Sequence, residues 1–203
     1  ASETGIEPSQ IFMNALQEVF LSEMNKNVMN RALYATGGTG TTVYDGITGI
    51  WEQITTNVVT GSSAISASNI IQAVEDTILE LDNDVLENEM DGVIVLMNQK
   101  MLRYYQSALA ASGAAWGYNP ADGKPRTYDG FRIETLSKMA DNNIIVINTN
   151  NIALGVGNMG EFEQFTMVDF RRTTLDKKFG MSIAGRFDIK VILESQASKW
   201  YKV

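Results

Sequence analysis

Near the start of the chain, apolar residues recur with the period of a helix. They recur at steps of three and four residues, at Phe12, Leu16, Val19, Phe20, Met24 and Val28. Ser9, which follows Pro8, is a suitable N-cap, and the pattern continues to about Tyr34. The pattern predicts a helix of roughly 25 residues and about 38 Å, which is about twice the usual helix length in globular proteins.

Near the end of the chain the period changes to two. Every second residue from 181 to 193 is apolar or glycine. These residues are Met181, Ile183, Gly185, Phe187, Ile189, Val191 and Leu193. This alternation predicts a strand of roughly 13 residues, or about 43 Å, with one buried face. A second strand-like run, 161–170, precedes it, and segment 171–178 is typical of a hairpin tip. The tip carries Arg171, Arg172, Lys177 and Lys178, which form either a solvated turn or a positive contact for an acidic partner surface.

Between these long elements the sequence predicts an ordinary α/β unit. A helix is expected from Ser68 to about Leu81, and short strands are expected at 131–136, 144–147 and 152–155. The run Val93–Met97 predicts a buried strand that stops at Asn98, the expected N-cap of a helix reaching Ser112. A long loop rich in glycine, proline and aromatic residues follows.

Two segments have the composition of a ligand site without its pattern. The glycine-rich segment 37–40 follows a helix and lacks Lys, so we interpret it as a hinge and not as a phosphate-binding loop. The acidic segment 81–92 begins like a calcium loop, but Leu86 and Glu87 stand where a ligand and the required glycine should be. We therefore expect a solvated linker there and no metal site.

Composition lowers the expectation of catalysis. The chain of 203 residues has no Cys and no His, which removes the cysteine nucleophile, the usual general base and the commonest metal ligand. The strand-to-helix junction at Asn98 therefore offers nothing reactive. A net charge of −8 argues against a chain that coats nucleic acid, and no apolar segment approaches the ~20 residues that cross a bilayer.

The lengths of the predicted elements point to an α+β fold with two lobes. The long helix and the long hairpin each approach the diameter of about 43 Å expected for a compact globule of this size. We expect them to pack on each other as a flat lobe made of residues 1–44 and 158–203, with residues 45–157 forming a compact α/β lobe. A flat lobe gains little core of its own, so neighbouring copies are expected to cover it.

The order of these features resembles the major capsid proteins of tailed bacteriophages, the Hong Kong 97-like family. The resemblance is carried by four stretches: "SQIFMNALQEVFLSEMNKNVMNRALY", "DGITGIWEQI", "GVIVLMNQKMLRYYQSAL" and "GFRIETLSKMADNNIIVINTNNIALGVG", followed by the closing antiparallel pair. It implies that the long helix is the spine helix of a peripheral domain and that the compact lobe is an axial domain. In that family an N-terminal arm and an extended loop normally precede the spine helix, and we expect both to be lacking here.

The resemblance implies a phage or prophage shell subunit that self-assembles into pentamers and hexamers around DNA, in virions built in the host cytoplasm. Expected subunit contacts lie in loop 112–130, with Trp116, Tyr118 and Arg126, and in the tip with Arg171, Arg172, Lys177 and Lys178. It implies no catalysis, no cofactor, no metal, no membrane and no sequence-specific nucleic acid. Its partners are copies of itself, with other virion proteins as further candidates.

Two other functions remain open on sequence grounds. A carboxylate-based hydrolase, such as a glycoside hydrolase, needs two carboxyls at a defined separation in a cleft, and no such pair stands out. A carbohydrate- or ligand-binding module would use Trp116 and Tyr118 as a stacking platform.

Overall fold

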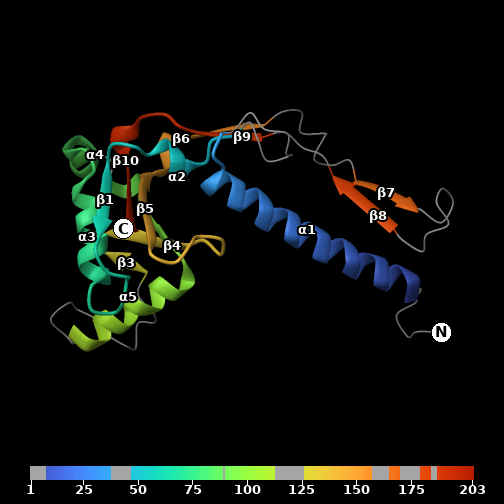
Figure 1. The fold of residues 1–203 in the computed structure, drawn as a ribbon, viewed down its shortest axis with the longest axis horizontal. Coiled ribbons are helices and arrows are strands. Elements are labelled where there is room, and N and C mark those ends of the chain that lie inside the picture. The colour runs from blue at the N-terminus through green and yellow to red at the C-terminus, as the bar shows by residue number, and fades with distance from the viewer. Residues whose placement is uncertain are drawn as a thin grey trace.

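The computed structural model describes residues 8–37, 47–88, 90–112, 126–156, 165–169, 179–183 and 187–203. They form a compact lobe and an arm (Figure 1). The arm contains the long helix α1 (Pro8–Tyr34) and the strand pair β7 (Phe165–Asp169) and β8 (Phe179–Ile183), which extend away from the lobe in the same direction. In Figure 1 the N-terminal end of α1 lies at the far end of the arm, and the C-terminus lies in the lobe.

A six-stranded mixed sheet forms the centre of the lobe, in the order β1-β10-β5-β2-β4-β3. Its strands are β1 (Val58–Gly61), β2 (Val93–Met97), β3 (Thr127–Tyr128), β4 (Phe131–Thr135), β5 (Asn143–Asn148) and β10 (Ala197–Lys202). The pairs β1–β10 and β2–β4 are parallel, and β10–β5, β5–β2 and β4–β3 are antiparallel.

Both faces of the sheet are covered. Helices α3 (Ile70–Leu79) and α5 (Gln99–Ser112) pack on one face, against a cluster that includes Val93, Val95 and Met97 of β2. The alternate β2 residues, Ile94 and Leu96, join a second cluster on the other face, below the short helix α2 (Ile50–Gln53). Because alternate residues of a strand face opposite sides, burial on both sides explains why β2 is apolar without interruption.

The predicted long helix is confirmed, with 27 residues in α1 and a length of about 40 Å at 1.5 Å per residue. Its C-terminal end is anchored in the lobe, where Leu33 is only 2% exposed. The chain after it is held by Gly49, whose backbone N–H donates to the Ala35 carbonyl at 2.7 Å. Toward the N-terminal end of the helix, Val19 is 62% exposed. The described part of the arm therefore presents apolar surface to solvent.

The predicted C-terminal hairpin is confirmed for β7 and β8, which pair with Phe165 opposite Ile183. The predicted strand 181–193 contains two strands with different partners, β8 and β9 (Phe187–Val191), since β9 pairs with β6 (Ile152–Val156). Residues 184–186 lie outside the described residues, so one continuous strand stays a prediction.

Several segments differ from the sequence-based expectation, and α2, β1 and β3 are among the elements that were not predicted. The expected solvated linker 81–92 contains helix α4 (Asn83–Asn88) and the 3₁₀ turn η1 (Met90–Gly92), because Val85 is 3% exposed and fixes the segment to the core. Strand β10 was not predicted, since its sequence "ASKWYK" mixes apolar and polar residues. The division into domains 1–44 with 158–203 and 45–157 stays a prediction, and β10 joins the sheet of the compact lobe.

Gly61 generates the first testable prediction. A Cβ atom at this position would lie 2.0 Å from the ring of Trp200, which is 4% exposed. We expect Gly61→Ala to lower the free energy of unfolding by about 1–3 kcal/mol, because the indole must move within a packed core. Urea unfolding measures the difference.

The matched control is Gly155→Ala in β6, where the nearest atoms to a new Cβ lie 3.8 Å away. This change should stay within about 0.5 kcal/mol of the unsubstituted protein. Equal effects at the two glycines would contradict the close approach of β1 to Trp200.

Candidate functional site

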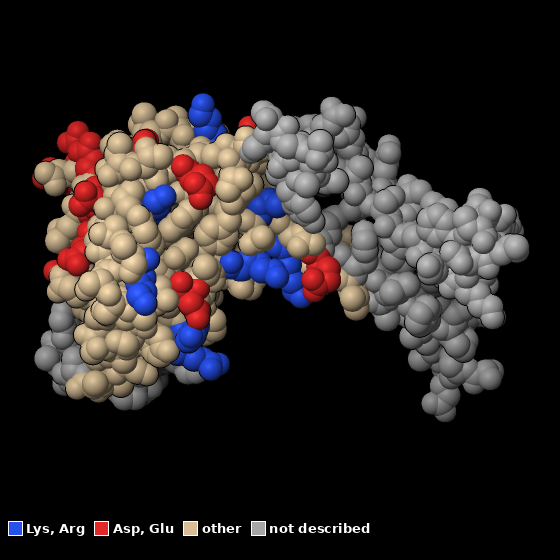
Figure 2. Space-filling model, viewed as in Figure 1, with Lys and Arg blue, Asp and Glu red and all other residues tan. Residues whose placement is uncertain are grey.

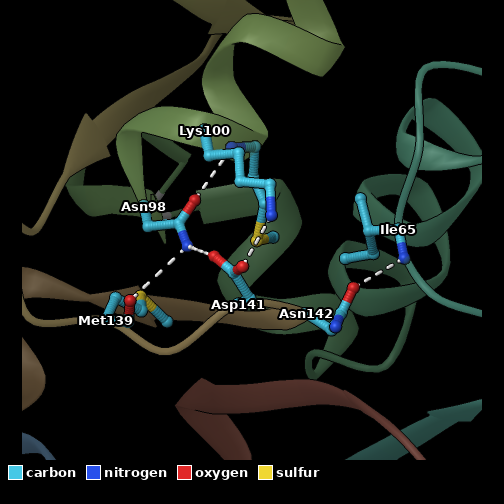
Figure 3. Close-up of polar contacts among 7 residues, drawn as sticks. Ile65, Asn98, Lys100, Met139, Asp141 and Asn142 are labelled. Carbon is cyan, nitrogen blue, oxygen red and sulfur yellow. Dashed lines mark hydrogen bonds and ion pairs between the residues drawn. The ribbon is translucent and has the colours of Figure 1, made fainter.

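The strand-to-helix junction is occupied by a polar network centred on Asn98, which is 8% exposed (Figure 3). Its Oδ1 accepts a hydrogen bond from the Met101 backbone N–H at 2.8 Å, as the sequence predicts for an N-cap. Its Nδ2 donates to Asp141 Oδ1 at 2.7 Å, and Lys100 Nζ donates to Asp141 Oδ2 at 2.7 Å. Side chains from two distant segments thus fix the start of α5.

The neighbouring turn is held in the same way. Asn142 has a positive φ of 61°, and its Oδ1 accepts from the Ile65 backbone N–H at 2.8 Å (Figure 3). Hydrogen bonds from Lys100 and from Asn98 hold the pKa of Asp141 below its usual range. The polar groups at this junction position α5 and the turn before β5.

A second polar network lies between α2 and β9, the elements that follow α1 and β8 along the chain. Gln53, at the end of α2, donates from Nε2 to the Thr48 carbonyl at 2.6 Å and to the Ile189 carbonyl at 2.9 Å. Its Oε1 accepts from the Val191 backbone N–H at 2.9 Å. One side chain therefore satisfies backbone groups of β9 and of the segment before α2. We call Tyr34 together with residues 47–57 and 189–201 the joint.

Glu194 and Asn57 complete the hydrogen bonds of the joint. One oxygen of Glu194 accepts from the backbone N–H groups of Thr55 and Thr56, the latter at 2.6 Å. These donors hold the pKa of Glu194 below its usual range. Asn57 Nδ2 donates to the Ala197 carbonyl at 3.1 Å. The chain leaving β9 is thereby fixed to the chain leaving α2.

Aromatic residues form the apolar part of the joint. The Trp51 ring lies 5.9 Å from the Tyr34 ring and 6.2 Å from the Tyr201 ring, which links α1, α2 and β10. Lys199 Nζ lies 4.9 Å from the centre of the Trp51 ring and donates to the Trp51 carbonyl at 2.8 Å. Burial lowers the pKa of Lys199.

A groove lies between α1 and the loop after β4. Its volume is about 460 Å³, and its lining residues are Glu18, Leu21, Ser22, Asn25, Lys26, Met29 and Ser137. Ser137, in the loop after β4, lies 3.9 Å from the sulfur of Met29. Within the described ranges, no group of three or more His, Cys, Asp and Glu side chains could hold a metal ion.

The structure places one of the predicted contact residues. Arg126 is exposed just before β3, and its carbonyl accepts from the Ile133 backbone N–H at 2.7 Å. The others lie outside the described residues, and they are Trp116, Tyr118, Arg171, Arg172, Lys177 and Lys178. Sequence reasoning missed Gln53 and Glu194, whose partners lie more than 130 residues away in the chain, and no local pattern indicates such pairs.

No family model matches this chain, and no curated protein matches it. Several solved structures match it. A subunit in the structure of the satellite phage P4 procapsid with its size determination (Sid) protein superposes with a TM-score of 0.65 and 9% identity, over 94% of this chain and 63% of that one. The capsid of an empty GTA particle gives a TM-score of 0.59 and 18% identity, over 92% and 66%. The SrpI encapsulin complex of Synechococcus elongatus gives 0.58 and 8%, over 93% and 65%.

The chain has the Hong Kong 97-like capsid fold. The α+β fold predicted from the sequence is therefore confirmed. The chain spans less than two thirds of the length of each of the three matched proteins. Among the described helices of this capsid fold, none is both long enough and apolar enough to cross a membrane.

Asn98 generates a prediction for the first network. We expect Asn98→Ala to lower the free energy of unfolding by about 1–2 kcal/mol, because α5 loses its N-cap and Asp141 loses a buried donor. Urea unfolding followed by circular dichroism measures the change. The exposed neighbour Gln99 is the control, and Gln99→Ala should stay within about 0.5 kcal/mol. An unaffected Asn98→Ala protein would contradict the role of this network.

Glu194 generates a prediction about pH. Because the folded-state pKa of Glu194 is lowered, its contribution to stability is present above the unfolded-state pKa and is lost as the pH falls through the folded-state pKa. At about pH 7, Glu194→Gln should lower the free energy of unfolding by about 1 kcal/mol.

The difference between Glu194→Gln and the unsubstituted protein should shrink at an acidic pH below the folded-state pKa of Glu194, where the wild-type carboxyl takes up a proton. Urea midpoints at the two pH values test this. Glu80→Gln, on an exposed side chain, is the control and should show no comparable difference at either pH. A Glu194→Gln effect that is the same at both pH values would show that the carboxylate charge is not what the joint uses.

Proposed function

We propose that this chain is a structural subunit of an icosahedral phage capsid, self-assembling into pentamers and hexamers that enclose DNA. The observation that carries the proposal is the superposition on the satellite phage P4 procapsid subunit, which includes 94% of the chain, arm and lobe together. A match to the lobe alone would indicate only a common α/β module. A match that includes the arm supports a function that uses the arm.

The exposed apolar side chains support the same function. Val19 on α1, Leu154 on β6, and Ile192 and Leu193 after β9 are between 53% and 63% exposed. They lie on the arm and at its attachment to the lobe. Neighbouring subunits in a closed array would cover these side chains, and many modest contacts of this kind add up over a symmetric shell.

We infer that the protein is not an enzyme and that its partners are first of all copies of itself. The polar networks at Asn98 and at the joint are used for positioning, which supports a structural role. We expect the protein in the virion, assembled in the host cytoplasm, with other virion proteins as further partners. Loop 112–130, with Trp116, Tyr118 and Arg126, and the tip 171–178 are the proposed additional contacts.

Assembly of the full-length gene product tests the proposal. We expect light scattering after size-exclusion chromatography to detect particles far larger than a monomer, and electron microscopy to show closed shells or rings of five and six. Leu154→Asp should raise the protein concentration needed for assembly by at least about tenfold, because a charge enters an apolar contact.

The control for this test is the stability of the variant. Leu154→Asp should unfold at the same urea concentration as the unsubstituted protein, because Leu154 is 63% exposed in the single chain. An unsubstituted protein that stays monomeric at high concentration would contradict the proposed function.

A further inference from the structure

The charges of this chain are strongly segregated along the sequence. Between Arg31 and Lys100 there is no Lys and no Arg. Within this range, the described part of the compact lobe from α3 onward contains a series of carboxylates. They are Glu75, Asp76, Glu80, Asp82, Asp84, Glu87 and Asp91. The sequence therefore gives one part of the lobe a uniform negative charge.

The fold gathers Glu80, Asp82, Asp84 and Glu87 into one surface, which we call the acidic face: the C-terminal end of α3 together with α4. Figure 2 shows acidic side chains along the margin of the lobe where Figure 1 places α3 and α4, with no Lys or Arg among them. Glu75 and Asp76 lie outside this face, because they interact with Tyr128 of β3. All four side chains of the acidic face are exposed, and Leu79, the last residue of α3, is 67% exposed next to Glu80. The acidic face thus combines a single sign of charge with an uncovered apolar side chain.

The lobe carries basic residues at the other end of the sheet. Helix α3 packs over β1 and β10, whereas β4 and β3 end the sheet on the opposite side. The exposed residues Lys100, Arg103, Arg126, Arg132 and Lys138 lie on β4, beside it, or near the start of α5, and we call them the basic edge. Figure 2 shows Lys and Arg, with some Asp and Glu among them, on the side of the lobe turned toward the arm.

Internal ion pairs reduce the charge of the basic edge without removing it. Lys100 pairs with Asp141 and Arg132 pairs with Glu134. No ion pair is found for Arg103 or Arg126 in the described parts of the chain, and both side chains are exposed. These two arginines are therefore the best placed to meet a carboxylate of another molecule.

We propose that the compact lobes of neighbouring copies bind head to tail, with the acidic face of one copy against the basic edge of the next. This inference rests on the proposed function and names the contact that the lobe uses. A surface that binds a different surface of an identical copy makes a heterologous contact, and such contacts close into rings when the rotation between copies allows it. Opposite charges select this pairing and like charges disfavour pairing of two acidic faces, while burial of Leu79 contributes apolar area.

Charge reversal tests the proposal in the full-length gene product. The first variant is Glu80→Lys with Asp84→Lys and Glu87→Lys, which leaves only Asp82 as a carboxylate of the acidic face and makes that face basic. The second is Arg103→Glu with Arg126→Glu, which makes the basic edge acidic, because Lys100 and Arg132 are already paired with carboxylates. Each variant alone should need at least about tenfold more protein to assemble, because like charges now face each other. Combining all five substitutions in one chain should restore assembly, because the polarity is reversed as a whole.

A mixture of the two variants gives a sharper result. Each variant can bind only the other, so copies must alternate around a ring. Alternation is possible around a ring of six and impossible around a ring of five. We therefore expect native mass spectrometry of the mixture to show six-membered rings with three copies of each variant, and few rings of five.

The control is Lys202→Glu, an exposed residue at the end of β10 outside the basic edge, which should assemble like the unsubstituted protein. Urea midpoints should be unchanged in all variants, since the altered side chains are exposed. Normal assembly of either reversed variant alone, or failure of the five-substitution chain, would overturn the head-to-tail contact and leave the shell function standing. Failure of the unsubstituted protein to assemble would overturn both.

Discussion

The length of α1 is the constraint on which the rest of the structure depends. A helix of 27 residues extends about 40 Å, whereas the strands of the lobe have two to six residues and span at most about 20 Å. The lobe can bury the end of the helix near Leu33 but cannot cover a helix of this length. The chain must therefore form an arm, and an arm held at one end needs either a rigid attachment or neighbours.

The joint provides the rigid attachment, and it does so mainly with polar side chains. Gln53 binds backbone groups on both sides of the connection, and Glu194 binds two consecutive backbone N–H groups. Hydrogen bonds fix direction more strictly than apolar contacts, which are not directional. The sheet and the joint have different roles. The two buried faces of the sheet stabilise the lobe, and the joint fixes the direction in which the arm leaves the lobe.

The sequence predicted those elements whose signal lies in the pattern of neighbouring residues. The periodicity of α1, the apolar run of β2 and the cap at Asn98 are properties of neighbouring residues, and each was placed within one or two residues. Strand β10 was missed because Ser198 and Lys199 interrupt its apolar pattern. The Ser198 hydroxyl donates to the Thr77 carbonyl, and Lys199 lies over Trp51. Their partners belong to helices far away in the sequence, so the strand is recognisable only in the folded chain.

The same limit applies to the candidate site. Loop length and composition directed attention to Trp116, Tyr118 and the basic tip, which stay predictions. The joint could not be predicted, because glutamine, glutamate and asparagine side chains that bind distant backbone groups have no spacing rule. Helix α4 could have been expected, since Leu81, Val85 and Leu86 recur at helical steps within the acidic segment. The many carboxylates of segment 81–92 led to the prediction of a linker, although a weak apolar pattern with helical spacing is present there.

The distribution of charge changes what the net charge of −8 means. An acidic subunit that avoids a packaged genome would need its negative charge on the surface that faces the genome. Here the range between Arg31 and Lys100 has carboxylates without any Lys or Arg, while the rest of the chain contains every basic residue. The negative charge is therefore concentrated in one range of the sequence, and in the described residues most of that range's carboxylates lie on the compact lobe. Such a polarity gives a direction to a contact between identical copies, and a direction is what a ring of identical subunits requires.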